Sequence, residues 1–146
     1  LESLLREIAH NGMKTMNERM MQAAIGKIGD DAIKSVGITY LNYMIEHPGI
    51  YETIQWATWH GTEETGKIFD NYLSLLKTLA LSCNFNPVNI DEILNLLTGV
   101  LHGYTTLQLR YAFTKPNEVR AALSTALDTV LAGLHQKYDQ HEKEHL

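Results

Sequence analysis

Apolar residues recur at intervals of three and four along almost the whole chain, the spacing that places them on one face of an α-helix. No useful length of chain alternates apolar and polar residues as a half-buried β-strand does. Long helical segments are predicted over residues 1–11, 30–46, 48–61, 62–83, 89–113 and 117–138. A methionine-rich stretch, residues 13–21, is expected to be helical as well. The pattern therefore predicts an all-α fold of about six helices.

Local features indicate where these helices begin and end. Gly12 is expected to end the first helix. Asp30 is a natural N-cap, because its side chain can accept a hydrogen bond from an unpaired backbone N–H. Pro48 can open one helix while the residue before it ends another, since that residue avoids helical dihedral angles. Asn89, followed by Glu92, resembles a capping box.

The size and charge of the chain narrow its function. Its 146 residues fit one domain, and 45% of them are hydrophobic, an ordinary value for a globular protein. The net charge is −5 and the 12 Lys and Arg residues are scattered, so this domain is not expected to bind nucleic acid by itself. Cys83 is the one cysteine, and no apolar run has the length of a membrane span. We expect a cytoplasmic protein with no membrane partner.

The last two predicted helices carry more uncharged surface than one packed face needs. Residues 93–109 hold no formal charge if His102 is neutral, and the final segment spreads apolar residues over an arc of about 180°. A helix packed on one core usually shows an apolar stripe of about 100°. We therefore expect a homodimer in which these two helices and their copies form a four-helix bundle. A helix central to a larger monomeric core is the alternative.

Small residues form one edge of that arc and would let a second helix approach closely: Ala122, Ala126 and Gly133. Both predicted helices contribute to the expected dimer interface. Its residues are Leu97, Leu101, Tyr104, Val119, Ala122, Leu123, Ala126, Val130 and Gly133.

Two short motifs in the same segments resemble a known family. Residues 101–107 (LHGYTTL), followed by 131–134 (LAGL), are similar to the C-terminal regulatory domain of TetR-family regulators, and most similar to its WHG subgroup. The junction at residues 40–51, which contains a His-Pro pair, resembles the same domains. Thr98 stands where the subgroup usually has a tryptophan, and the literal WHG at residues 59–61 is treated as coincidence. The resemblance spans nearly the whole chain.

The resemblance implies a transcriptional regulator, repressor or activator, that works as a homodimer. Residues 1–12 would end a linker helix from a DNA-binding headpiece, a helix-turn-helix that these residues do not include. Residues 13–138 would form the ligand-binding and dimerisation domain, and residues 139–146 a polar tail. DNA would be bound only through the headpiece. A small hydrophobic or aromatic effector would tilt the linker helix, so that the headpieces no longer match half-sites about 34–36 Å apart.

The middle of the chain concentrates aromatic residues, as an apolar small-molecule pocket would. The expected ligand-binding residues are Tyr40, Tyr43, Met44, Trp56, Trp59, Phe69, Tyr72, Leu76 and His102. For each of these taken singly, packing in the core is the alternative. The methionines of residues 13–21 are adaptable packing material that would also suit a variable ligand.

The residue types and their spacing do not indicate catalysis or metal binding. No nucleophile, base or carboxylate pair stands out at a catalytic spacing, so no enzyme is predicted. No cofactor or metal is expected; His141 and His145, four residues apart, belong to the polar tail. Two alternatives stay open. One is a helical haem- or lipophile-binding protein, with His60 and His102 as axial ligands, and the other is a structural dimerisation module without a ligand.

Overall fold

Six α-helices and one short 3-10 helix form the part of the chain that the computed structural model describes, residues 1–111 and 115–139. They are α1 (Glu2–Ala24), α2 (Gly29–Glu46), α3 (Pro48–His60), α4 (Glu63–Leu81), η1 (Pro87–Asn89), α5 (Ile90–Tyr111) and α6 (Pro116–Tyr138). This part contains no strand, so the predicted all-α fold is confirmed. None of its helices is long and apolar enough to cross a membrane. His141 and His145 lie outside the described residues.

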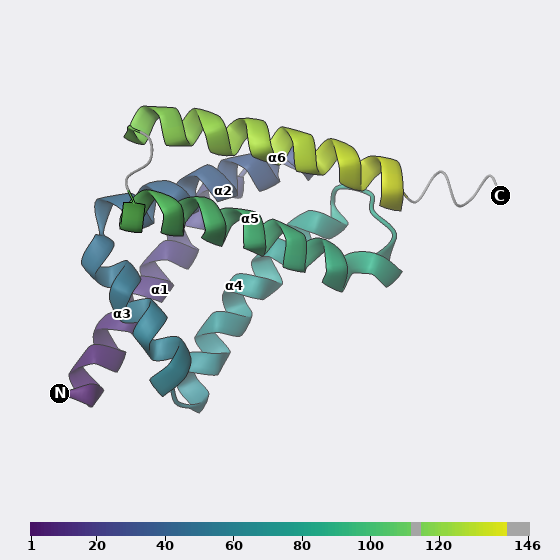
Figure 1. Cartoon of the computed structure of the whole chain (residues 1–146). Helices are drawn as coiled ribbons and strands as arrows, with labels where there is room; N and C mark the ends of the chain where they lie inside the picture. Colours follow the sequence, from purple (N-terminus) through teal and green to yellow (C-terminus); the bar gives the residue numbers. More distant parts are fainter. Residues whose placement is uncertain (112–114, 140–146) are drawn as a thin grey trace.

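α2 lies at the centre of the molecule and contacts each of the other five helices (Figure 1). Its buried positions fall on more than one face and include Ala32, Val36 and Leu41, each fully buried. α1, α3 and α4 pack to one side of it, while α5 and α6 run side by side along the other (Figure 1). The N-terminal end of α1 and the whole of α6 therefore lie at opposite sides of the molecule.

α1 runs without a break from residue 2 to residue 24, so the predicted end at Gly12 is wrong. A Cβ atom added at Gly12 would collide with the side chain of Ile50, which comes from α3. Gly12 therefore allows α3 to approach α1 closely, and it does not stop the helix. α1 ends at Ala24 instead, before Gly26 and Gly29, whose φ angles of 76° and 63° favour glycine.

Three of the predicted helix starts, at Pro48, Thr62 and Asn89, are confirmed, and the cap at Asp30 is wrong. α3 begins at Pro48 as predicted. α2 begins at Gly29 with no side-chain cap, and the Asp30 carboxylate instead binds His135. α5 begins at Ile90, directly after Asn89 as predicted. Before it, Asn86 caps the short 3-10 helix η1, where its side chain accepts a hydrogen bond from the backbone N–H of Val88. The local sequence favoured Asp30 as a cap, but its carboxylate binds a distant residue instead.

α4 begins as predicted after Thr62 with a capping box. The Thr62 side chain accepts from the backbone of Thr65, and the backbone N–H of Thr62 donates to Thr65 Oγ1 over 3.0 Å. This satisfies two of the N–H groups that every helix start leaves unpaired.

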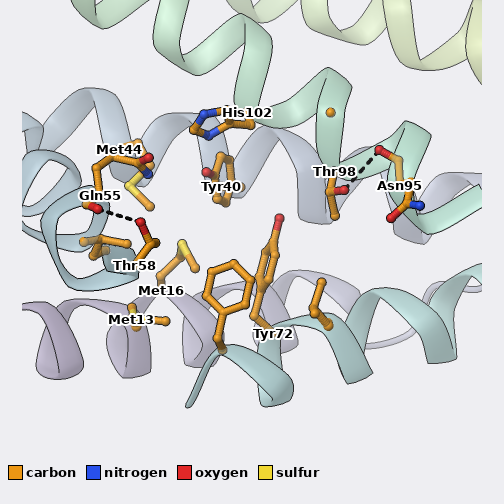
Figure 2. A pocket seen from close by; sticks show the side chains of 14 residues that line it. Met13, Met16, Tyr40, Met44, Gln55, Thr58, Tyr72, Asn95, Thr98 and His102 are labelled. Atoms are coloured by element: carbon orange, nitrogen blue, oxygen red, sulfur yellow. Dashed lines mark hydrogen bonds between the residues drawn. The ribbon is translucent and has the colours of Figure 1, made fainter. Parts of the chain in front are cut away.

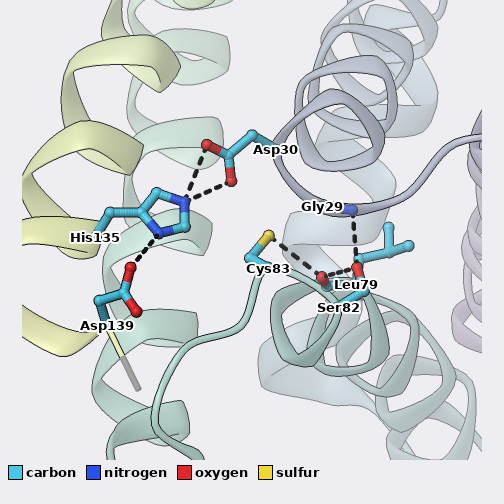
Figure 3. Close-up of polar contacts among 7 residues, drawn as sticks. All are labelled: Gly29, Asp30, Leu79, Ser82, Cys83, His135 and Asp139. Carbon is cyan, nitrogen blue, oxygen red and sulfur yellow. Dashed lines mark hydrogen bonds and ion pairs between the residues drawn. The ribbon is translucent and has the colours of Figure 1, made fainter. Parts of the chain in front are cut away.

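The C-terminal end of α6 is tied to the start of α2 and the end of α4 (Figure 3). His135 Nε2 lies 2.8 Å from Asp30 Oδ1, and its ring lies 4.6 Å from that of Phe85. Beside this pair, the Gly29 N–H donates to Ser82 Oγ over 3.0 Å. Burial, and then the nearby Asp30, raise the pKa of the Cys83 thiol to about 12, so this thiol stays protonated. The cluster fixes how α6 lies across α2.

Candidate ligand-binding site

A cleft of about 510 Å³ opens between five of the six helices (Figure 2). Its lining residues are Met13 and Met16 of α1, Tyr40 and Met44 of α2, Ile54, Gln55 and Thr58 of α3, Phe69, Tyr72 and Leu73 of α4, and Asn95, Thr98, Gly99 and His102 of α5. Most of the lining is buried or half-buried, whereas Thr58, Phe69, Asn95, Gly99 and His102 are exposed and form a rim. A cleft of this volume has room for one small molecule, and part of its rim lies between α3 and α5.

Three aromatic rings form a continuous wall of the cleft. The ring centroids of Phe69 and Tyr72 lie 5.6 Å apart, and those of Tyr72 and Tyr40 lie 6.0 Å apart. The ring planes are inclined by 55° and 35°, tilted arrangements of the kind that aromatic pairs favour. Both tyrosines are only 6% exposed. This wall offers ring faces and edges to an aromatic ligand.

The hydroxyl groups of Tyr40 and Tyr72 make no hydrogen bond among the described residues, unlike those of Tyr51 and Tyr138, which bind Thr106 and Glu92. Neither oxygen is sealed from solvent, so both face the cleft. Figure 2 shows the Tyr72 ring between α4 and α5 with its hydroxyl directed toward α5. Burial raises the pKa of both phenols, and for Tyr40 the neighbouring tyrosines raise it further. Both hydroxyls therefore remain neutral donors.

The threonine hydroxyls of the cleft are also neutral. The Thr58 and Thr98 hydroxyls donate to backbone carbonyls of their own helices, over 2.7 Å and 2.8 Å, which leaves their oxygens free to accept. His102 Nε2 lies 3.4 Å from the Thr106 hydroxyl on the rim. No Lys, Arg, Asp or Glu belongs to the described lining. The site offers hydrogen bonds and apolar contact without a fixed charge.

The structure brings several of the sequence-predicted ligand residues into this cleft. Tyr40 and Met44 come from α2, Phe69 and Tyr72 from α4, and His102 from α5. They span residues 40–102 of the chain, yet they surround one space. Aromatic enrichment in the middle of the chain therefore pointed to residues that line this cleft.

The other predicted ligand residues lie elsewhere. Tyr43 is buried between the His47 ring and the Arg19 guanidinium, and Leu76 is a core residue only 1% exposed. Trp56 stacks on His60 at the end of α3, outside the lining of the cleft. Trp59 is 87% exposed and lines a neighbouring, more open cleft. Each stands on a predicted helix but points away from the space that the five helices leave between them.

Sequence reasoning missed a larger group of lining residues. They are Met13, Met16, Ile54, Gln55, Thr58, Leu73, Asn95, Thr98 and Gly99. The methionines had been recognised as adaptable material, and the uncharged face of α5 had been assigned to a dimer interface. Small and neutral polar residues follow no sequence pattern that would identify them as lining a cleft. Only the packing of α3 near α5 shows that they surround one space.

A network of polar contacts ties α1 to the turn between α3 and α4, beside the cleft. Arg6 Nε donates to the His60 carbonyl over 2.9 Å, and His10 Nε2 lies 2.6 Å from Thr65 Oγ1. Glu64 lies 3.9 Å from both His10 and Lys14. Since Met13 and Met16 follow on the same helix and line the cleft, α1 is held both by the site and by this turn.

The outward face of α5 and α6 forms a shallow groove of uncharged residues. It is lined by Val100, Tyr104, Ala121, Ala122, Thr125, Ala126, Thr129 and Val130. Leu96 and Leu107 on the same face of α5 are 46% and 45% exposed. Two charged residues of α6 turn away from the groove toward α2. Asp128 binds Lys34 of α2 over 2.7 Å, and Arg120 binds Asn42 of α2.

The residues predicted for a dimer interface divide into two groups. Tyr104, Ala122, Ala126 and Val130 line the outward groove, and Gly133 is exposed beside it. Leu97, Leu101, Val119 and Leu123 are at most 3% exposed and pack inside the subunit. These four leucine and valine side chains hold α5 and α6 to the core, so they are not available to a second copy.

His60 and His102, the pair considered for a haem, occupy different surroundings. His60 stacks on Trp56 at the exposed end of α3, outside the lining of the cleft, and His102 lies on its rim. Within residues 1–111 and 115–139, no group of three His, Cys, Asp or Glu side chains is placed to hold a metal ion.

Comparison with known proteins gives one family match, over residues 33–130, to the family described as "Tetracyclin repressor-like, C-terminal domain". The chain is 25% identical over 135 residues to the uncharacterized HTH-type transcriptional regulator YobS of Bacillus subtilis (strain 168). That alignment covers 92% of this chain and 70% of the regulator.

Two further relatives are enzymes named tRNA-2-methylthio-N(6)-dimethylallyladenosine synthase, from Ralstonia pickettii and Leptothrix cholodnii. They are 25% and 28% identical over 134 and 138 residues, which cover 85% and 93% of this chain. The chain spans only 27% and 29% of the length of these synthases.

Proposed function

Because the chain belongs to the tetracyclin repressor-like C-terminal domain family, we propose that it is the ligand-sensing and dimer-forming domain of a TetR-type transcriptional regulator. The observation that carries this proposal is the uncharged cleft of about 510 Å³, whose walls come from α1 to α5. A site built from so many helices can couple a bound molecule to their relative positions. The role is binding and not catalysis, since the family is one of regulators.

The coupling would run through α1. Met13 and Met16 line the cleft, while Arg6 and His10, two turns and one turn earlier, hold the α3–α4 turn. A ligand that moves α3 or α4 would therefore move the N-terminal half of α1. Two arrangements of α1 form a two-state equilibrium, and the ligand shifts it by its difference in affinity for the two states.

The DNA-binding part of the proposal concerns the full-length protein. The relative in Bacillus subtilis is named as an HTH-type regulator, and this chain spans 70% of it. A helix-turn-helix preceding α1 would be carried by that helix in each subunit of a dimer. A tilt of α1 would then change the separation of the two recognition helices, which must match half-sites on DNA.

A neutral fluorescent probe tests the sensing function. N-phenyl-1-naphthylamine is uncharged and brightens in apolar sites, so the wild-type protein is expected to bind it with micromolar affinity. The Gly99→Trp variant places an indole at the rim, where a Cβ atom meets nothing within 4 Å, and is expected to weaken binding at least about tenfold.

Gly49→Trp is the matched control, because Gly49 also has open space around it but does not line the cleft. Equal probe binding by the wild type and both variants would mean that the probe binds elsewhere. Absence of probe binding by the wild type would favour the alternative of a structural dimerisation module, in which the cleft has no occupant.

A further inference from the structure

We propose that the cleft selects an uncharged molecule with an aromatic body and a hydrogen-bond acceptor such as a carbonyl oxygen, to which Tyr40 and Tyr72 donate from their hydroxyl groups. This inference rests on the proposed sensing function and specifies the chemical class of the effector.

The described lining of the cleft contains no charged residue, and this favours a neutral ligand. A bound anion or cation would leave water without gaining an opposite charge, and an unpaired buried charge is costly. Asp70 belongs to the neighbouring cleft, which shares Phe69 and Thr58, but it is exposed to solvent. His102 is the ionisable side chain of the rim and is exposed as well. Neither offers a buried counter-charge, so a neutral ligand is favoured.

The two phenol hydroxyls favour a ligand that can form hydrogen bonds with them. Each belongs to a side chain that is 6% exposed, and neither has a hydrogen-bond partner among the described residues. Both hydroxyls are open to the cleft, and an apolar ligand that covered them would leave each donor without a partner, which costs free energy. A ligand that accepts these hydrogen bonds is therefore expected to bind more tightly than one that offers only apolar contact.

The direction of these hydrogen bonds decides what the ligand must supply. Because burial raises the pKa of both tyrosines, each hydroxyl keeps its proton and donates it. The Thr58 and Thr98 protons are already bound to backbone carbonyls. Among the lining residues that are buried, Tyr40 and Tyr72 are the ones that carry a side-chain hydrogen-bond donor, and an acceptor on the ligand would pair with both.

The aromatic wall sets the shape of the rest of the ligand. Phe69, Tyr72 and Tyr40 follow one another at centroid distances of 5.6 Å and 6.0 Å. Met13, Met16 and Met44 lie in the same lining, and thioether sulfur contacts aromatic rings favourably. A ligand with aromatic rings next to its carbonyl would meet both kinds of group at once.

Four related probes test the class. Benzophenone is a neutral aromatic ketone, diphenylmethane has the same rings without the acceptor, 4-benzoylbenzoate adds a negative charge, and 4-(aminomethyl)benzophenone adds a positive one. Their affinities are measured by displacement of bound N-phenyl-1-naphthylamine. Benzophenone is expected to bind about tenfold more tightly than each of the other three.

Removal of the donors provides the second measurement. In Tyr40→Phe, Tyr72→Phe and the double variant, the preference for benzophenone over diphenylmethane is expected to fall, to about onefold in the double variant, while diphenylmethane binds as before. Tyr43→Phe is the matched control, because Tyr43 belongs to α2 and is buried but does not line the cleft. It is expected to keep the full preference. The single variants serve if the double variant does not fold.

The outcomes distinguish a failure of this inference from a failure of the proposed sensing function. If a charged probe binds as tightly as benzophenone, or if the preference persists without both hydroxyls, the inference is overturned and the sensing function stands. If none of the four probes displaces the dye, the ligand class is overturned. If the dye itself does not bind at the cleft, both the inference and the sensing function are overturned.

Discussion

Gly37 lies at the point where α2 meets both α5 and α6. A Cβ atom added there would stand 2.8 Å from Leu101 Cδ2 and 3.0 Å from Leu127 Cδ1, which belong to two different helices. A valine at this position would have to displace both leucines in a packed core. We expect Gly37→Val to lower the free energy of unfolding by about 1–3 kcal/mol, measured by urea denaturation.

Gly66 is the matched control for that substitution. It lies on the exposed face of α4, where an added Cβ atom meets nothing within 4 Å. Gly66→Val is expected to change the free energy of unfolding by no more than about 0.5 kcal/mol. Equal effects of the two substitutions would contradict the close approach of α2 to α5 and α6.

The buried phenols of Tyr40 and Tyr72 predict how stability changes at high pH. Burial raises their pKa in the folded state above the ordinary value of 10.0, which the unfolded chain retains. Their contribution is therefore complete below pH 10 and is lost as the pH rises above it. The free energy of unfolding should fall by up to about 1.4 kcal/mol per pH unit for each tyrosine.

Denaturant titrations between pH 8 and pH 11 measure this loss. The Tyr40→Phe/Tyr72→Phe variant lacks both ionisable groups and is expected to show a shallower decline than the wild type. Parallel declines would mean that these two phenols are not buried as described.

At the scale of the helix, one hydroxyl group takes part both in the attachment of α1 and in the start of α4. Thr65 Oγ1 binds His10 Nε2 over 2.6 Å and accepts the Thr62 N–H over 3.0 Å. Thr65→Val would leave the 8% exposed His10 without this partner and would break the capping box. We expect a loss of about 1–3 kcal/mol in the free energy of unfolding.

Amide hydrogen exchange locates that effect. Faster exchange is expected at the start of α4 and in the N-terminal half of α1, while α6 stays protected. Thr53→Val is the control, since the Thr53 hydroxyl only donates to the Gly49 carbonyl of its own helix. If Thr65→Val leaves α1 unchanged, this contact does not couple the turn to the helix.

At the scale of the whole molecule, the groove between α5 and α6 is the surface that a second copy would cover. Its described lining contains no charged residue, and Leu96 and Leu107 remain nearly half exposed beside it. We expect the wild type to sediment as a dimer at micromolar concentration. Ala126→Arg would place an unpaired charge inside the interface and is expected to yield monomers.

Ser74→Arg adds the same charge to the exposed surface of α4 and is expected to leave the dimer intact. Wild-type protein that sediments as a monomer would contradict the proposed assembly. A dimer that persists in Ala126→Arg would assign its interface to another surface of the molecule.

Much of the secondary structure followed from local physics. Three- and four-residue spacing of apolar residues predicted the helices, and Pro48 marked the boundary between α2 and α3 correctly. Gly12 and Asp30 were misjudged, because a glycine can serve helix packing and a polar side chain can bind a distant partner. Those partners, Ile50 for Gly12 and His135 for Asp30, are 38 and 105 residues away in the chain.

The sequence by itself determined that this chain is helical, that its last two helices are short of charge, and that aromatic residues gather near the middle, because each follows from the order of residues. The tertiary structure decided which of those residues share a space. Tyr40 and Tyr72 meet at the cleft while Tyr43 and Trp59 do not, and Ala126 faces outward while Leu123 faces inward. Such choices depend on how each helix is rotated and where it crosses its neighbours, which many weak contacts fix together.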